Sequence, residues 1–183
     1  MDIEQHYIDL YRSMHEDKNT YQGVSLFKET PNIANIVLIT NSQTVLDYGC
    51  GKGSQYTDSH LNILFHINDE NIYMYDPGFP EHENIPEDKF DGVISTDVLE
   101  HIPEEIVPKI LDEIYSKANK FVYLAICTRL AQAILPNGEN AHCTVKEPDW
   151  WEKHIIKSNK NKIHTEVHWY GNHNDYRKYY TSS

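Results

Sequence analysis

The segment from Val45 to Gly53, VLDYGCGKG, constrains the fold more than any other part of the chain. A short apolar run ends in Asp47, and glycines follow at alternate positions, Gly49, Gly51 and Gly53. Because glycine has no Cβ, such a backbone can turn tightly from a strand into a helix and approach a ligand closely. The segment therefore predicts a buried parallel strand followed by a turn that binds a nucleotide cofactor.

Two residues near this turn distinguish between cofactors. The dinucleotide pattern Gly-x-Gly-x-x-Gly needs a third glycine where this chain has Ser54. Asp47 precedes the first glycine by two residues, and a carboxylate there attracts an ammonium or a sulfonium rather than two phosphates. In these respects the turn resembles motif I of the class I S-adenosylmethionine (SAM) dependent methyltransferases.

Two later segments extend the resemblance in the right order. Residues 71–76 form a second apolar run that ends in Asp76, close to the roughly 20 residues expected between such a turn and a ribose-binding acid. A carboxylate at that position can accept hydrogen bonds from both ribose hydroxyls. Residues 90–96, followed by DVLEH at 97–101, resemble the segment at the fourth strand of many small-molecule methyltransferases.

The resemblance implies that SAM is the methyl donor and S-adenosylhomocysteine the product. Cys50 is expected to contribute its backbone, with a small buried thiol rather than a nucleophile. The cofactor-binding residues that the resemblance implies are Asp47, Gly49, Cys50, Gly51, Gly53, Asp76, Pro77, Thr96, Asp97 and Val98.

His101 is the candidate catalytic residue. An unperturbed imidazole has a pKa near neutrality, so His101 could remove a proton from an acceptor hydroxyl. The alternative is structural, with Glu100 and His101 holding the turn before the helix at Pro103. Methyl transfer often needs only the alignment of acceptor and sulfonium, so position is expected to matter more than acid-base chemistry.

The acceptor pocket is expected near the loop at residues 136–144 and the indoles at 150–151. Glu100, His142 and Trp150 are the candidate substrate-binding residues, and a plain surface loop with one tryptophan in the core is the alternative. Residues 21–25 are a candidate lid over the cofactor, or else a connection between helices.

The order of elements predicts a three-layer α/β fold with a mostly parallel, Rossmann-like methyltransferase sheet. An antiparallel C-terminal hairpin is expected from the alternating pattern at 163–170, a turn at 171–174 and a strand at 176–181. Only 13 residues, 77–89, separate Asp76 from the next strand, which leaves no room for the usual third strand and its adenine-binding acid. The acids of this interval are no more than candidates for adenine binding; they are Glu81, Glu83, Glu87 and Asp88.

Helices are expected at 2–16, at 30–39, after the glycine turn and from Pro103 onward, where Pro108 should bend the helix or delay its start. A fully buried strand is expected at 121–126. The chain is predicted to form one methyltransferase domain over residues 1–183, with N-terminal helices or a lid at 1–40 and a catalytic core at 44–183.

The composition of the chain restricts the classes of molecule that it can be expected to bind. The net charge of −12 disfavours nucleic acid, and no apolar run is long enough to span a membrane. The three cysteines lack CxxC spacing, which favours reduced thiols and a cytoplasmic protein. His164 and His168 would lie roughly 13 Å apart along a strand, too far to share an ion, so no metal site is predicted.

The favoured interpretation is a SAM-dependent enzyme that methylates an oxygen or nitrogen of a small molecule by direct displacement. A SAM-binding regulatory or partner protein without methylation activity is the alternative. A nucleic-acid methyltransferase is a further alternative, although Ser95-Thr96-Asp97-Val98 replaces the Asn/Asp-Pro-Pro-aromatic tetrad of enzymes that methylate base amino groups.

Overall fold

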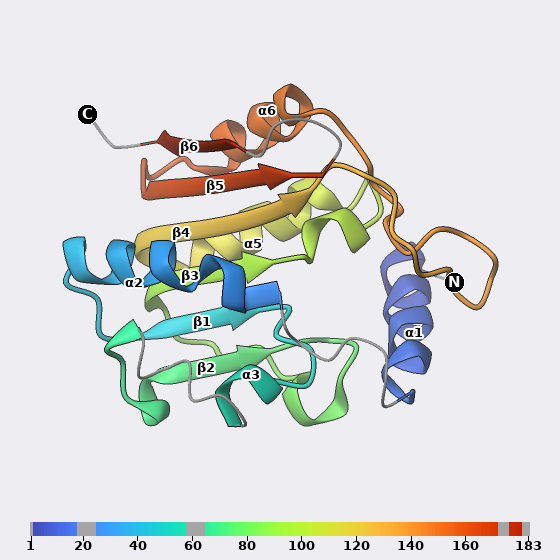
Figure 1. Cartoon of the computed structure of the whole chain (residues 1–183), viewed down its shortest axis with the longest axis horizontal. Coiled ribbons are helices and arrows are strands. Elements are labelled where there is room, and N and C mark those ends of the chain that lie inside the picture. The colour runs from blue at the N-terminus through green and yellow to red at the C-terminus, as the bar shows by residue number, and fades with distance from the viewer. Residues whose placement is uncertain (1, 18–24, 58–64, 172–175, 181–183) are drawn as a thin grey trace.

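The computed structural model describes residues 2–17, 25–57, 65–171 and 176–180 (Figure 1). The α-helices within these ranges are α1 (Ile3–His15), α2 (Thr30–Ile39), α3 (Ser54–Thr57), α5 (Val107–Lys117) and α6 (Pro148–Ser158). The strands are β1 (Val45–Tyr48), β2 (Ile72–Tyr75), β3 (Phe90–Thr96), β4 (Ala118–Cys127), β5 (His164–Tyr170) and β6 (Tyr176–Tyr180). Short 3-10 helices are η1 (Ser25–Glu29), η2 (Asp69–Asn71), η3 (Pro80–His82) and η4 (Leu99–His101).

The strands form one sheet in the order β2-β1-β3-β4-β5-β6. The first five are parallel, as expected for a Rossmann-like methyltransferase sheet. At the far edge, β6 pairs with β5 in antiparallel register, from Thr165 opposite Tyr180 to Trp169 opposite Tyr176. Residues 172–174 of the expected turn lie outside the described ranges.

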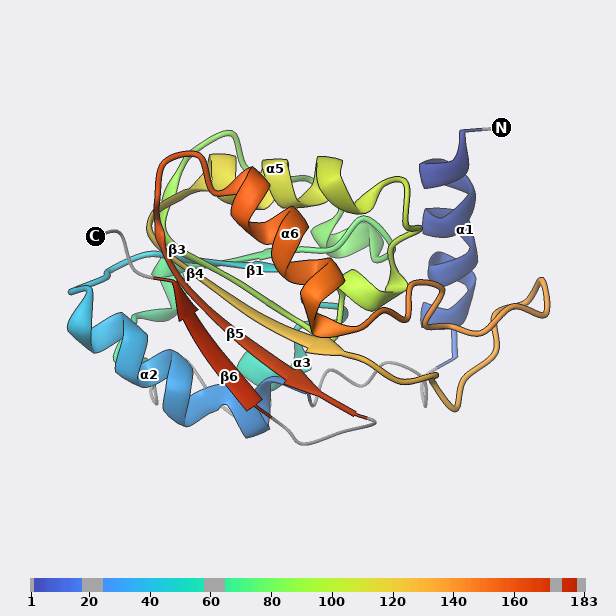
Figure 2. The same cartoon turned by 90° about the horizontal axis from the view of Figure 1, so that it is seen from above.

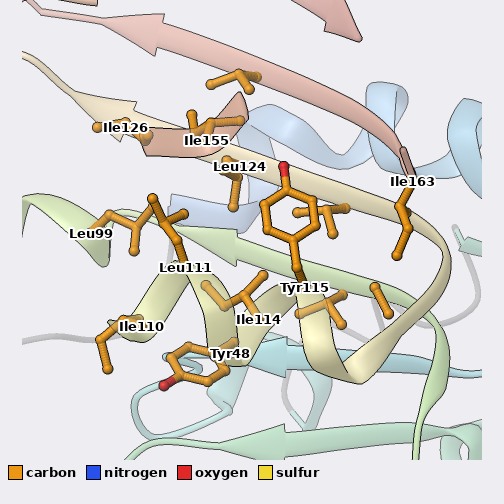
Figure 3. Packing of buried hydrophobic residues seen from close by; sticks show 14 of the residues in the cluster. Tyr48, Leu99, Ile110, Leu111, Ile114, Tyr115, Leu124, Ile126, Ile155 and Ile163 are labelled. Carbon is orange, nitrogen blue, oxygen red and sulfur yellow. The ribbon is translucent and has the colours of Figure 1, made fainter. Parts of the chain in front are cut away.

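Helices cover both faces of the sheet, which gives the predicted three layers. Figure 2 shows α5 and α6 on one face and α2 with α3 on the other. The strand β4 is buried on both faces. Val122 and Leu124 belong to the apolar cluster under α5 and α6 (Figure 3). Phe121 and Tyr123 belong to the apolar cluster under α2. This double burial explains why its sequence is a continuous apolar run.

Prolines set where two of the helices begin. Pro31 occupies the first turn of α2, where the missing N–H costs no hydrogen bond. Pro108 has the same place in α5, which begins at Val107 and not at Pro103. The residues from Pro103 to Ile106 form a separate turn, in which the Ile106 N–H donates to the Pro103 carbonyl. The predicted delay of this helix is therefore confirmed.

The sheet ends at β2 on its other edge. The described segment 76–89 contains no strand, only the 3-10 turn η3, so the third strand is absent as its length predicts. The helix α1 stands apart from both layers, beyond the carboxyl ends of the parallel strands (Figures 1 and 2). None of the helices in the described part of the chain is long and apolar enough to cross a membrane.

Candidate active site

A cavity of about 790 Å³ lies at the carboxyl ends of β1, β2 and β3 and is closed on one side by α1. Ligands of open parallel sheets bind at this edge, because the loops that follow the strands converge there. Most of the predicted site residues lie in its wall, namely Gly49, Cys50, Gly51, Asp76, Pro77, Thr96, Asp97, Val98, His101 and His142.

The glycine turn forms one wall of the cavity through its backbone. Gly49 and Gly51 adopt φ values of 86° and 59°, which residues with a Cβ rarely tolerate. The N–H groups of Gly49 and Cys50 both donate to the Tyr75 carbonyl, at 2.7 and 3.1 Å, and so tie the turn to the end of β2. Burial raises the pKa of the Cys50 thiol far above its ordinary value, in line with an inert side chain.

Asp76 joins the turns that follow β1 and β2. Its Oδ2 accepts a hydrogen bond from the Gly51 N–H and its Oδ1 accepts one from the Gly78 N–H, both at 2.8 Å. Each carboxylate oxygen has a second lone pair, so the group can still accept hydrogen bonds from a ligand. The side chain is therefore fixed at the cavity wall with acceptor capacity to spare.

Asp47 and Gly53 are not in the cavity wall. Asp47 Oδ2 accepts hydrogen bonds from Gln55 Nε2 at 3.1 Å and from the Tyr56 hydroxyl at 2.8 Å. Burial raises the pKa of Asp47 to about 7, against the opposing effect of these two hydrogen bonds. A Cβ on Gly53 would lie 2.4 Å from Met74 Sδ, so this glycine permits close packing behind the turn. Both residues therefore support the glycine turn on the side that faces away from the cavity.

The turn after β3 brings two acids together. Asp97 has φ of 58°, and its Oδ2 lies 3.8 Å from Lys28 Nζ. Burial raises the pKa of Asp97, and the Lys28 charge opposes that shift. Glu100 lies behind Asp97, outside the cavity wall, where its Oε1 accepts a hydrogen bond from the Cys127 N–H at 2.9 Å.

His101 faces the cavity as a neutral imidazole. Its Nδ1 lies 2.8 Å from the Ala141 carbonyl oxygen, so the proton resides on Nδ1 and is donated to that oxygen. Burial lowers the pKa of His101 to about 3, and the neighbouring His142 adds to this effect. Because the ring is desolvated, its pKa lies below that of an unperturbed imidazole, and a base this weak accepts protons poorly.

Trp150 is not in the cavity wall. Pro148 begins α6, so the two indoles lie on a helix that follows the 136–144 segment. Trp151 is buried in the core, and Trp150 packs against it and against His154, with ring centroids 4.9 and 4.3 Å away. The geometry gives no support for a contact between Trp150 and a substrate.

The helix α1 supplies part of the wall that the sequence analysis did not assign to the site. Tyr7 and Tyr11 line the cavity, and their hydroxyls donate to Glu139 Oε2 at 2.6 Å and to the Ala141 carbonyl at 2.7 Å. Their spacing of four residues places them on one helix face, which is the signal that could have found them. Of the expected lid, Ser25 lines the cavity and residues 21–24 lie outside the described ranges.

Two further segments differ in whether they line the cavity. The segment 129–133 after β4 lines the cavity, as its position beyond the carboxyl end of a strand would suggest. By contrast, the acids considered for adenine recognition do not line the cavity; they are Glu81, Glu83, Glu87 and Asp88.

The histidines weighed as metal ligands do not share a site. His164 Nε2 lies 3.4 Å from Glu166 Oε1, and His168 Nδ1 lies 2.8 Å from Glu29 Oε1. Each therefore has its own carboxylate partner.

A family model described as a methyltransferase domain matches residues 21–180, which is most of the chain. A search of curated proteins returned no match to this sequence. The matched region contains the glycine turn, Asp76 and the turn after β3, and its parallel sheet places all three around one cavity. The chain belongs to the class I SAM-dependent methyltransferases.

Proposed function

We propose that the cavity binds SAM and that the enzyme transfers its methyl group to an oxygen or nitrogen of a small molecule. The observation that carries this proposal is the pair of hydrogen bonds that fix Asp76 between the N–H groups of Gly51 and Gly78. This geometry holds a carboxylate beside bare glycine backbone, as a ribose next to an amino-acid moiety requires. The glycine turn would hold the methionine end, and Asp76 would accept hydrogen bonds from the ribose hydroxyls.

The methyl group would point toward the turn at residues 96–98. Bound SAM would supply an electrophilic methyl group there: an acceptor lone pair would attack the methyl carbon, and the electron pair of the carbon–sulfur bond would pass to sulfur. The acceptor loses a proton to solvent, and S-adenosylhomocysteine remains. Because burial lowers the pKa of His101 to about 3, alignment of the acceptor would contribute more than proton removal by this residue.

The size and cover of the cavity support a small acceptor. Its volume of about 790 Å³ falls within the range of roughly 300–1,000 Å³ typical of small-molecule sites. Tyr7 and Tyr11 of α1 line the cavity and are held there by hydrogen bonds to residues of the 139–141 segment. The net charge of −12 would repel a nucleic-acid backbone.

Calorimetry with SAM, S-adenosylhomocysteine and NAD tests cofactor use directly. We expect the first two to bind and NAD not to bind; binding of NAD alone would refute the proposal. Incubation of the enzyme with methyl-labelled SAM and fractionated small molecules from a cell extract tests the acceptor class. Label that appears only in macromolecules, and never in the small-molecule fraction, would rule out a small acceptor.

A further inference from the structure

A side-chain cluster in and behind the cavity wall has the composition of a metal site. Glu100 from η4, Cys127 at the end of β4 and His142 from the following loop each offer one ligand atom, and these atoms lie within 4.8 Å of one another. Carboxylate oxygen, thiolate sulfur and imidazole nitrogen are the donors that zinc takes in proteins. A tetrahedral zinc ion holds its ligand atoms roughly 3.5 Å apart, so small side-chain movements would close the site.

The unsatisfied oxygen of Glu100 is a second observation that points to a ligand. The residue is 0% exposed, and no donor among the residues that the structure describes reaches its buried Oε2. The side chain that interacts with it is another acid, Asp97. A buried carboxylate oxygen without a partner is costly unless it binds a proton or a cation.

His142 makes the kind of hydrogen bond that a ligating histidine usually makes through its other ring nitrogen. Its Nδ1 lies 2.6 Å from the Arg129 carbonyl oxygen, to which it donates its proton. The lone pair is then on Nε2. A backbone carbonyl that fixes the tautomer in this way is the usual outer partner of a ligating histidine.

The cluster is open to the cavity on one side. Cys127 and His142 line the cavity, whereas Glu100 closes the cluster from behind. Three protein ligands with one open position are typical of catalytic zinc sites, whereas structural sites have four protein ligands.

We propose that Glu100, Cys127 and His142 bind one Zn²⁺ ion whose fourth coordination position opens into the cavity. The use of that position rests on the proposed function. The hydroxyl oxygen of an acceptor would occupy it, release its proton to solvent because the ion lowers the pKa of the hydroxyl, and attack the methyl carbon as described above. The prediction of no metal site considered only histidines that are close in sequence; these three ligands come from three separate segments.

Metal binding is tested on the tag-free protein without reference to activity. After removal of metal by a chelator, Zn²⁺ titration should show one ion per chain. Co²⁺ in its place should give the intense d–d bands of a tetrahedral site and a thiolate charge-transfer band. Acetohydroxamate, an oxygen ligand for such ions, should shift the d–d bands if one position is open.

Three single variants assign the ligands. Cys127→Ser should remove the thiolate band, and Glu100→Gln and His142→Ala should each weaken Zn²⁺ binding by more than the roughly 10- to 100-fold that loss of an outer partner costs. Cys143→Ser and His154→Ala are the matched controls, because neither residue lines the cavity or belongs to the cluster. Circular dichroism verifies that each variant is folded.

Several results would overturn the proposal: no Zn²⁺ bound above background by the wild type, no thiolate band with Co²⁺, or equal affinity in the wild type and the three variants. SAM calorimetry on the zinc-free protein separates the two proposals. If SAM binds and Zn²⁺ does not, the site proposal alone fails. If Zn²⁺ binds and SAM does not, the proposed function fails.

Discussion

A Cβ placed on Gly49 would lie 2.3 Å from Cγ2 of Val98, well inside van der Waals contact. The first glycine of the turn after β1 and the valine of the turn after β3 are therefore packed against each other at the cavity wall. The two sequence motifs that indicated the family are complementary in shape, because one provides bare backbone where the other provides a branched side chain.

Gly49→Ala should destabilise the fold by about 2–5 kcal/mol, since the new methyl group overpacks against Val98 and also requires an unfavourable positive φ. Gly138→Ala is a matched control, because Gly138 has a similar φ of 90° but nothing within 4 Å of the position that an added methyl group would take. It should lose only about 1–2 kcal/mol. Chemical denaturation measures both, and equal losses would contradict the packing argument.

The double variant Gly49→Ala/Val98→Ala should recover part of the loss, because truncation of Val98 makes room for the added methyl group. A coupling of about 1 kcal/mol or more in the double-mutant cycle is expected for side chains in direct contact. Additive losses would show that backbone strain alone accounts for the effect of the first substitution.

Asp76→Ala should weaken SAM binding by roughly 100-fold or more, since two hydrogen bonds to a charged acceptor contribute about 1.5–3 kcal/mol each. The loss of the bonds to the Gly51 and Gly78 N–H groups would also loosen both turns. Asp88→Ala, on an exposed acid of the following segment, should leave the affinity unchanged. Calorimetry measures the SAM affinity of each variant, and an unchanged affinity in Asp76→Ala would show that the ribose lies elsewhere.

Asp47 should make the fold less stable as the pH rises. Burial raises its pKa from an ordinary value near 4 to about 7, so the folded state binds the proton more tightly than the unfolded state. This contribution is therefore greatest below about pH 4 and is lost as the pH rises to about 7, by on the order of 4 kcal/mol in all.

Asp47→Asn, which is neutral at every pH, should remove this dependence and be more stable than the wild type at pH 8. Denaturation curves from pH 4 to pH 8 measure the difference, with Asp88→Asn as the exposed control. Parallel stability profiles for the wild type and Asp47→Asn would show that the buried carboxyl does not titrate in this range.

His101 should not titrate in the physiological range. Because burial lowers its pKa to about 3, the ring stays neutral above about pH 5. Its NMR signals should therefore be constant from pH 5 to pH 8, whereas an exposed histidine shifts near pH 6.5. Between pH 6 and pH 8, kcat should depend on pH in the same way in the wild type and in His101→Asn. A decrease of kcat at low pH in the wild type alone would show that His101 acts as a base.

Local sequence determined much of the fold. The continuous apolar run of β4, the prolines in the first turns of α2 and α5, and the short interval after Asp76 each restrict the backbone within a few residues. Such restrictions depend on φ, on missing N–H groups and on chain length, so they can be predicted without knowledge of distant contacts. The glycine turn was predictable for the same reason, whereas Asp76 was predicted from its spacing after that turn and from the resemblance to the family.

The direction in which a side chain points was harder to predict. Asp47 precedes the glycines as the resemblance requires, yet its carboxylate is bound by Gln55 and Tyr56 behind the turn. Trp150 was a candidate substrate-binding residue, yet it lies on α6 outside the cavity wall. In both cases the outcome depends on neighbours that the motif does not contain.

The sequence by itself indicated the family through its resemblance to known motifs. It also determined the parallel sheet and the segments that meet at its carboxyl edge, because glycine, proline and apolar patterns act locally. Only the tertiary structure decided which side chains reach the cavity. Tyr7 and Tyr11 do so from the first helix, and Glu100, Cys127 and His142 converge from three segments. Such convergence depends on packing between residues that are far apart in the chain, and burial there also moves the pKa of His101 and Glu100 away from their ordinary values.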